Sequence, residues 1–284
     1  MDEKITIIAD STCDLSKEII REYGIEIAPL CIVLDDRSYL DSVDITPEEI
    51  FRWAKARKTT PKTSAILPEN TVELLRPHLE AGEDVLFFTI SESMSSTCNV
   101  AKLAGSGFDT GRLFVIDSQN LSTGIGLQVL RACDLKASGL PAEEIAERIK
   151  ADRDKVRASF VIDTLDYLAM GGRCSGMTAL LGNALKLHPS IYVKDGKMSV
   201  GKKYRGRLER VITDYVKDLE KDLMKADKKR VFITHSGVSK DTVDRVYGYL
   251  ASLDHFDDII ETLAGGVISC HCGPGTLGVL FYEE

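Results

Sequence analysis

Short apolar runs alternate with segments of helical periodicity through the first half of the chain. Residues 5–9, 84–90 and 112–117 are apolar runs bounded by glycine or polar residues, a pattern typical of buried strands. Helices are expected to start at 46–49 and 141–144, where a proline precedes two glutamates of the first turn. Strands separated by helices in this way predict βαβ units and a parallel, Rossmann-like sheet covered on both faces.

The second half continues the alternation with one clear hairpin. An apolar run at 159–165 predicts a strand, and residues 190–204 predict two strands joined at Asp195-Gly196, a hairpin turn signal. A long amphipathic helix is expected over 207–229, followed by another strand. The segment 265–284 indicates a strand, a Gly-rich turn and a final strand. The hairpin makes this second sheet mixed rather than purely parallel.

Length and composition favour two closely packed α/β domains. At about 150 residues per domain, 284 residues predict two. No Pro- or Ser-rich linker separates them, and we place the boundary at 1–155 and 156–284. With 44% apolar and 28% charged residues the chain is globular rather than disordered or fibrous. The net charge of −8 argues against nucleic acid as a partner, because binding a phosphate backbone takes a basic face.

Cysteine usage and the N-terminus indicate a cytoplasmic protein. The seven cysteines are odd in number and the chain is large, which disfavours a disulfide framework. No basic region followed by an apolar stretch opens the sequence, and no apolar run approaches the ~20 residues that span a bilayer.

Hydroxyl-rich clusters follow several predicted strands, at the sheet edge where ligands bind in open α/β folds. The first, 10–14, is explained by a helix cap. The loop 59–64 holds four hydroxyls, and 91–97 places serines at the start of a helix, where hydroxyl and backbone N–H groups can meet an anion. The turn 171–175 carries a cation, Arg173, that could hold a phosphate, although a helix ending in glycine explains the turn equally well.

Five cations crowd into residues 202–210 of this acidic protein. Such a run is usually a solvated face, and the alternative is a docking site for a phosphate or an acidic partner. The cations are Lys202, Lys203, Arg205, Arg207 and Arg210.

The cluster Cys270-His271-Cys272 allows three interpretations: a metal site, a thiolate–imidazole pair, or a histidine that hydrogen-bonds a bound anion. No second CxxC or HxxxH pair completes a tetrahedral metal site. Adjacent residues on a strand point to opposite faces, which disfavours the catalytic pair. The sequence also lacks GxxxxGK[ST], GxGxxG, GxSxG and HExxH motifs. This pattern favours binding an anion over catalysis.

Taken in order, these clusters resemble the DegV family, the fatty-acid-binding proteins that carry the substrate for bacterial fatty acid kinase. The resemblance runs end to end, through IIADSTCDL, the Thr63-Ser64 loop, ISESMSSTCNVA, VIDSQNLSTGIGL, DTLDYLAMGGRCS, HPSIYVKDGKM with YRGR, and HCGPGTLGVLF. It implies two α/β domains with a ligand channel at their junction. The implied ligand is a long-chain fatty acid such as palmitate, stearate or oleate, with no cofactor and no metal.

The resemblance also assigns residues. It implies that Thr63 and Ser95 meet the carboxylate, with Ser64 and Ser96 nearby, and that His271 and Arg205 lie at the carboxylate end. The protein would not be an enzyme. It would take the acid during transient contact with a membrane surface and present the carboxylate to a separate ATP-dependent kinase subunit, which forms the acyl-phosphate. The docking or phosphate-facing residues would be Lys202, Lys203, Arg205 and Arg207.

Three positions depart from the family pattern: Ser96 stands for the usual Gly, Cys272 for Thr, and Ala65-Ile66 for Gln-Pro. Two other functions stay open. One is a small-molecule enzyme that uses Cys270-His271-Cys272 or Cys98, and the other is a regulatory binding protein for a different small carboxylate or phosphate.

Overall fold

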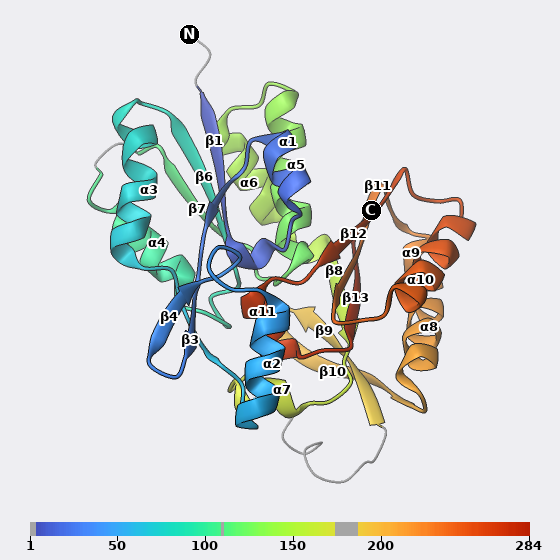
Figure 1. Cartoon of the computed structure of the whole chain (residues 1–284). Coiled ribbons are helices and arrows are strands. Elements are labelled where there is room, and N and C mark those ends of the chain that lie inside the picture. Colours follow the sequence, from blue (N-terminus) through green and yellow to red (C-terminus); the bar gives the residue numbers. More distant parts are fainter. Residues whose placement is uncertain (1–3, 109–110, 174–186) are drawn as a thin grey trace.

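The computed structural model of the protein describes residues 4–108, 111–173 and 187–284. Its first half is built on a parallel sheet in the order β2-β1-β6-β7 (Figure 1). Two of these strands, β1 and β6, are buried along their whole length, as their apolar sequences predict. The strands are β1 (Ile5–Asp10), β2 (Glu26–Ala28), β6 (Asp84–Thr89) and β7 (Leu113–Asp117).

Helices cover both faces of this sheet, which confirms the Rossmann-like arrangement. Alternate residues of β6 enter different cores: Phe87 packs with Leu75 of α3, whereas Phe88 packs with Ile125 of α5. In Figure 1, α3 and α4 lie on one side of the sheet and α1, α5 and α6 on the other. These helices are α1 (Lys17–Tyr23), α3 (Pro68–Glu80), α4 (Thr97–Gly105), α5 (Thr123–Ala137) and α6 (Ala142–Asp152).

A small antiparallel sheet, in the order β4-β3-β5, extends from the first half. It matters for function because β5 carries Thr63 and Ser64. The adjacent helix α2 starts as its sequence predicts, with Thr46 and Glu49 forming a capping box and Pro47 at the first helical position. The elements are β3 (Cys31–Leu34), β4 (Arg37–Leu40), β5 (Lys62–Ser64) and α2 (Pro47–Arg57).

As predicted, the second half is built on a mixed sheet. Its strand order is β10-β9-β8-β13-β11-β12. Only the β11–β12 pair is parallel among the described pairings of this sheet. The hairpin turn at Asp195-Gly196 is confirmed, and both residues have positive φ, 51° and 73°. The strands are β8 (Val156–Val161), β9 (Leu187–Lys194), β10 (Lys197–Arg205), β11 (Ala226–Ser236), β12 (Asp258–Leu263) and β13 (Thr276–Glu283).

Helices α8 (Leu208–Asp218), α9 (Glu220–Leu223) and α10 (Lys240–Ser252) pack on the outer face of this sheet (Figure 1). The helix expected over 207–229 is therefore too long at its C-terminal end. Ala226 pairs with Glu283 of β13, so residues 226–229 belong to the strand. Residues 227–229 are charged, so in the sequence they look like a continuation of the polar face of the helix. The exposed end of a strand is equally polar, and the pattern therefore does not mark where the helix ends.

The prediction of a strand at the start of 265–284 is wrong, because residues Gly266–Cys272 form a helix, α11. Its first turn is fixed by two buried aspartates of the first half. Asp14 accepts a hydrogen bond from the Gly265 N–H and Asp41 one from the Gly266 N–H, each at 2.8 Å. These carboxylates stand where side-chain caps and the helix dipole favour an acceptor. The caps lie far away in the sequence, so local patterns do not reveal this helix.

The two halves share one continuous core. Phe88 and Ile125 of the first half belong to the same buried cluster as Phe160 and Leu280 of the second. Helix α11 lies beside α2 and α7 (Asp166–Met170) in Figure 1. It also touches the mixed sheet, where Ser269 Oγ lies 2.9 Å from Ser236 Oγ of β11. The domain boundary near residue 155 stays a prediction. Across the described ranges, every helix is too short or too polar to cross a membrane.

Candidate ligand-binding site

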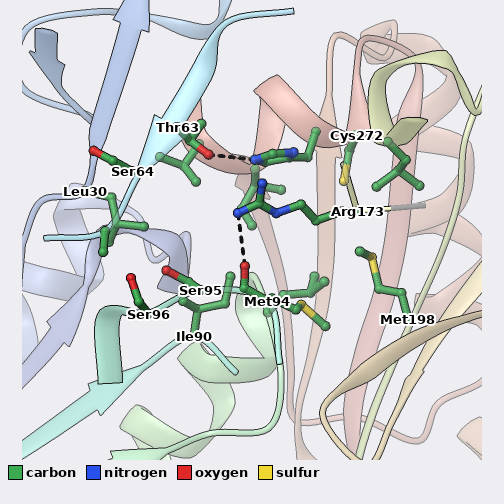
Figure 2. Close-up of a pocket in the computed structure, with 16 residues that line it drawn as sticks. Leu30, Thr63, Ser64, Ile90, Met94, Ser95, Ser96, Arg173, Met198 and Cys272 are labelled. Atoms are coloured by element: carbon green, nitrogen blue, oxygen red, sulfur yellow. Dashed lines mark hydrogen bonds between the residues drawn. The ribbon is translucent and has the colours of Figure 1, made fainter. Parts of the chain in front are cut away.

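A cavity opens where the small sheet, the loop after β6, α7, β10 and α11 meet (Figure 2). The cavity has a volume of about 210 Å3. One group of lining residues is polar: Thr63, Ser64, Ser95, Ser96, Arg173 and His271. The other is apolar and includes Leu30, Ile90, Leu121, Leu168, Met198 and Ile268. Five of the six residues predicted to lie at the carboxylate end thus line one cavity, and the sixth, Arg205, is not among its described lining residues.

Thr63 and His271 come together inside this cavity, with Thr63 Oγ1 2.8 Å from His271 Nε2. Burial, and to a lesser degree Arg173, lowers the pKa of His271 to about 4, so the ring is neutral at pH 7. The other ring nitrogen, Nδ1, is buried and has no hydrogen-bond partner among the described residues. We therefore assign the proton to Nε2, since a buried N–H without an acceptor costs more than a free lone pair.

This tautomer sets the direction of the Thr63 hydroxyl. Because Nε2–H donates to Thr63 Oγ1, the threonine proton is free to donate to a ligand in the cavity. Gly171 makes room for the ring: a Cβ at this position would lie 2.2 Å from His271 Nδ1. The site therefore holds a histidine that orients a hydroxyl donor, without adding a charge of its own.

The serines lie at the start of α4, across the cavity from Thr63 (Figure 2). Ser95 Oγ lies 2.9 Å from Thr97 Oγ1 and accepts a hydrogen bond from the Thr97 N–H. Ser96 occupies the N-cap position, and within the described part of the chain its hydroxyl makes no capping hydrogen bond. Hydroxyl groups at a helix N-terminus, where the helix dipole is positive, favour an anion.

Arg173 supplies a positive charge to this cavity. The sequence left two interpretations of its turn open, a phosphate-binding cation or a helix ending in glycine. Its guanidinium donates to the carbonyl oxygens of Gly171 and Met94, at 2.8 and 3.2 Å, and so spans the cavity wall (Figure 2). The contact with Met94 joins residues 79 positions apart, which no local motif reveals. The remaining members of that turn, Cys174 and Ser175, lie outside the described residues.

The cysteines beside His271 are poorly suited to nucleophilic chemistry. Burial raises the pKa of the Cys272 thiol to about 12 and raises that of Cys270 further. Burial likewise raises the pKa of Cys98 to about 11. All three thiols are therefore protonated at pH 7, and the thiolate is the reactive form. Among the described residues, no group of three or more His, Cys, Asp or Glu side chains is arranged to hold a metal ion.

The basic run does not form one surface. Lys202 and Tyr204 both bond Asp218 of α8, through Lys202 Nζ at 2.6 Å and Tyr204 Oη at 2.7 Å. Lys203 and Arg205 alternate with them along β10 and so belong to the opposite face of the strand. Arg207 follows the strand with its side chain 90% exposed. Among the described lining residues of the cavity, none comes from 202–210.

A second, smaller cavity continues the first. The two share Leu121, Ile268 and Cys272, and the second lies between α11 and the inner face of the mixed sheet, against Phe160 and Leu280. Together they lead from a polar group of donors towards the apolar core between the halves.

Comparison with known proteins places the chain in a family. A model described as an uncharacterised protein of the DegV family matches residues 4–284. A DegV domain-containing protein of Deinococcus radiodurans is 32% identical over 97% of each chain. A DegV family protein from Thermus thermophilus, described as fatty acid binding, is 33% identical, covers 99% of this chain and 100% of its own, and superposes with a TM-score of 0.89.

A third relative is described as a stearic-acid-binding protein from Eubacterium ventriosum. It is 27% identical, covers 98% of each chain and has a TM-score of 0.84. The likeness extends over both sheets, because the shared length leaves out almost nothing of either chain. The chain belongs to the DegV family.

Proposed function

We propose that this protein binds a long-chain fatty acid with its carboxylate among Thr63, Ser95 and His271. The observation that carries the proposal is the cavity itself, in which hydroxyl groups, a neutral imidazole and one guanidinium line a space whose other walls are apolar. The relatives from Thermus thermophilus and Eubacterium ventriosum, described as binding fatty acid and stearic acid, support the same ligand class.

The donors suit a carboxylate. A buried carboxylate is stabilised when each oxygen accepts hydrogen bonds, and charge-assisted bonds are about twice as strong as neutral ones. Thr63 has a free hydroxyl proton because His271 bonds its oxygen, and Ser95 and Ser96 add donors at the start of α4. Arg173 provides the compensating charge from the adjacent wall.

The acyl chain would run past Leu121 and Ile268 towards the smaller cavity near Phe160. Each methylene buried there contributes roughly 0.8 kcal/mol, before the costs of association are subtracted. Most of the affinity thus comes from the hydrocarbon, while the polar end fixes its direction.

We further propose that the protein presents this carboxylate to a separate ATP-dependent kinase subunit and takes the acid from a membrane surface in the cytoplasm. Lys203, Arg205 and Arg207 are the candidates to face the kinase or the transferred phosphate, because they are exposed on or just after β10. Lys202 is a weaker candidate, since it is paired with Asp218 on the other face. In this scheme the protein is a substrate carrier rather than an enzyme.

Extraction tests the ligand. Freshly purified protein is denatured in organic solvent and the extract analysed by mass spectrometry, with expected recovery of about one long-chain fatty acid per chain. Protein that yields none and also fails to take up added palmitate or oleate would contradict the proposal. A small carboxylate or phosphate in the extract would favour the regulatory alternative.

A second experiment tests presentation. The loaded protein is incubated with ATP and the catalytic subunit of a bacterial fatty acid kinase, and acyl-phosphate is measured as the hydroxamate. We expect product only when both proteins are present. Fatty acid recovered by extraction, without any product from this assay, would leave binding intact and remove the kinase role.

A further inference from the structure

The imidazole of His188 lies between two main-chain carbonyl oxygens. His188 stands on β9 and is 5% exposed. Its Nδ1 is 3.0 Å from the carbonyl oxygen of Asp163, and its Nε2 is 3.1 Å from that of Gly206. A carbonyl oxygen only accepts hydrogen bonds, so both contacts are favourable only when both ring nitrogens carry protons. The carboxylate of Asp163, with Oδ1 3.3 Å from Nδ1, provides the counter-charge for such a cation.

The two carbonyls belong to segments with different tasks. Asp163 lies between β8 and α7, and α7 contributes Leu168 to the wall of the ligand cavity. Gly206 is the bend between Arg205 and Arg207 and has a φ of +129°, a conformation that residues with a side chain rarely adopt. The ring thus ties the cavity wall to the bend that carries two exposed cations.

We propose that His188 is a positioning residue: its doubly protonated ring clamps the Asp163 and Gly206 segments together and thereby fixes the direction of Arg205 and Arg207. The clamp stands on the geometry of the ring alone. Its effect on how the carboxylate is presented to the kinase rests on the proposed function, in which Arg205 and Arg207 face the kinase.

Among the described residues, Asp163 is the titratable group that contacts this ring. Tyr204 pairs with His188 across β9 and β10. The Tyr204 hydroxyl is held by Asp218 of α8, which also pairs with Lys202. Asp163 is therefore the acid in direct contact with the ring, while Arg205 and Arg207 flank the carbonyl that it bonds. A ring with a single proton would set a nitrogen lone pair against a carbonyl oxygen and open one side of the clamp.

Two substitutions separate this role from simple packing. Glutamine at position 188 is neutral and has a single donor group, whereas the lysine ammonium carries three donors and a charge. His188→Gln should make the amides of residues 203–210 exchange with solvent about tenfold faster or more, while His188→Lys restores slower exchange. His255→Gln is the matched control, because His255 bonds only one carbonyl, that of Ala226.

Hydrogen exchange read by mass spectrometry gives the outcome on the full-length, lipid-loaded protein. Faster exchange confined to 203–210 and to peptides around 163, rescued by lysine, supports the clamp. Equal exchange in the glutamine variant, or faster exchange spread over the core strands of both variants, overturns it. Fatty acid extraction from the same samples reports separately on the proposed function.

A measurement on the wild-type protein tests the clamp even if the variants fail to fold. Nitrogen-detected NMR of the imidazole rings, recorded beside hydrogen exchange of residues 203–210, shows whether both nitrogens of His188 carry protons. We expect protons on both nitrogens in protein whose 203–210 segment is protected from exchange. A neutral ring beside a segment that is still protected would overturn the clamp.

Discussion

His271 Nε2 and Thr63 Oγ1 lie 2.8 Å apart, although 208 positions separate the two residues in the sequence. The contact joins the small sheet of the first half to the last helix of the second. It leaves the threonine with a proton to donate, so the polar end of the cavity depends on residues from both halves of the chain.

Removing the two central hydroxyls should weaken fatty acid binding. In the double variant Thr63→Ala, Ser95→Ala the carboxylate loses two hydrogen-bond donors. Each hydrogen bond to a charged group contributes about 1.5 kcal/mol or more, so the dissociation constant should rise roughly a hundredfold. Displacement of a fluorescent fatty acid measures this change. Ser252→Ala is the control, because its hydroxyl bonds only Tyr249 O at the exposed end of α10. Equal affinity in the double variant and the control would contradict the site.

Acid should destabilise the protein through His271. The ring titrates near pH 4 in the folded protein and near 6.5 when unfolded, so between these values the unfolded chain binds more protons. Stability from this group is therefore complete above pH 6.5 and is lost as the pH falls towards 4, by about 3 kcal/mol.

Urea unfolding of wild type and His271→Asn across pH 4–7 checks this sign. We expect the difference in unfolding free energy to change with pH in favour of the variant as acid is added. Asp10, whose pKa burial raises to about 6, titrates in the same window but is present in both proteins and cancels. A difference that stays constant with pH would contradict the neutral, buried ring.

Gly171→Ala should impair the site through a single methyl group. The new Cβ would lie 2.2 Å from His271 Nδ1, so the ring must move and its contact with Thr63 weakens. We expect at least about tenfold weaker fatty acid binding, equal to the loss of about one hydrogen bond. Gly248→Ala, in α10 with nothing within 4 Å of the new Cβ, should bind normally and gain up to about 1 kcal/mol of stability. The same affinity in both variants would show that the ring is not held there.

Asp41 should matter as an acceptor rather than as a charge. It accepts hydrogen bonds from the Gly266 N–H and the Ser11 hydroxyl, while burial raises its pKa and makes the charged form costly. Asp41→Ala should lower the unfolding free energy by about 2 kcal/mol and weaken binding, because α11 loses a cap. Asp41→Asn keeps one acceptor oxygen and should lose less than half as much, as chemical denaturation and lipid displacement would measure. An asparagine variant no better than alanine would argue that the charge itself is needed.

The sheets could be predicted because their signals are local. The buried runs of β1 and β6 and the Asp195-Gly196 turn need no distant partner to be recognised. The serine cluster of 91–97 was also visible, since it follows a predicted strand. Helix α11 and the place of Arg173 were not, because aspartates 251 and 225 positions away cap the helix and Met94 fixes the arginine. Once β10 is known, strand alternation explains why Lys202 and Lys203 lie on opposite faces, with Lys202 bonded to Asp218.

The late position of helix α11 in the sequence also affects when the site can form during synthesis. During synthesis, the parallel sheet and the serines of α4 emerge long before residues 266–272. Until then Asp14 and Asp41 lack their N–H partners and Thr63 lacks its imidazole. We therefore expect the polar end of the cavity to be complete only after translation has delivered residues 266–272. Because its capping contacts join residues so far apart in sequence, we expect α11 to dock slowly in folding.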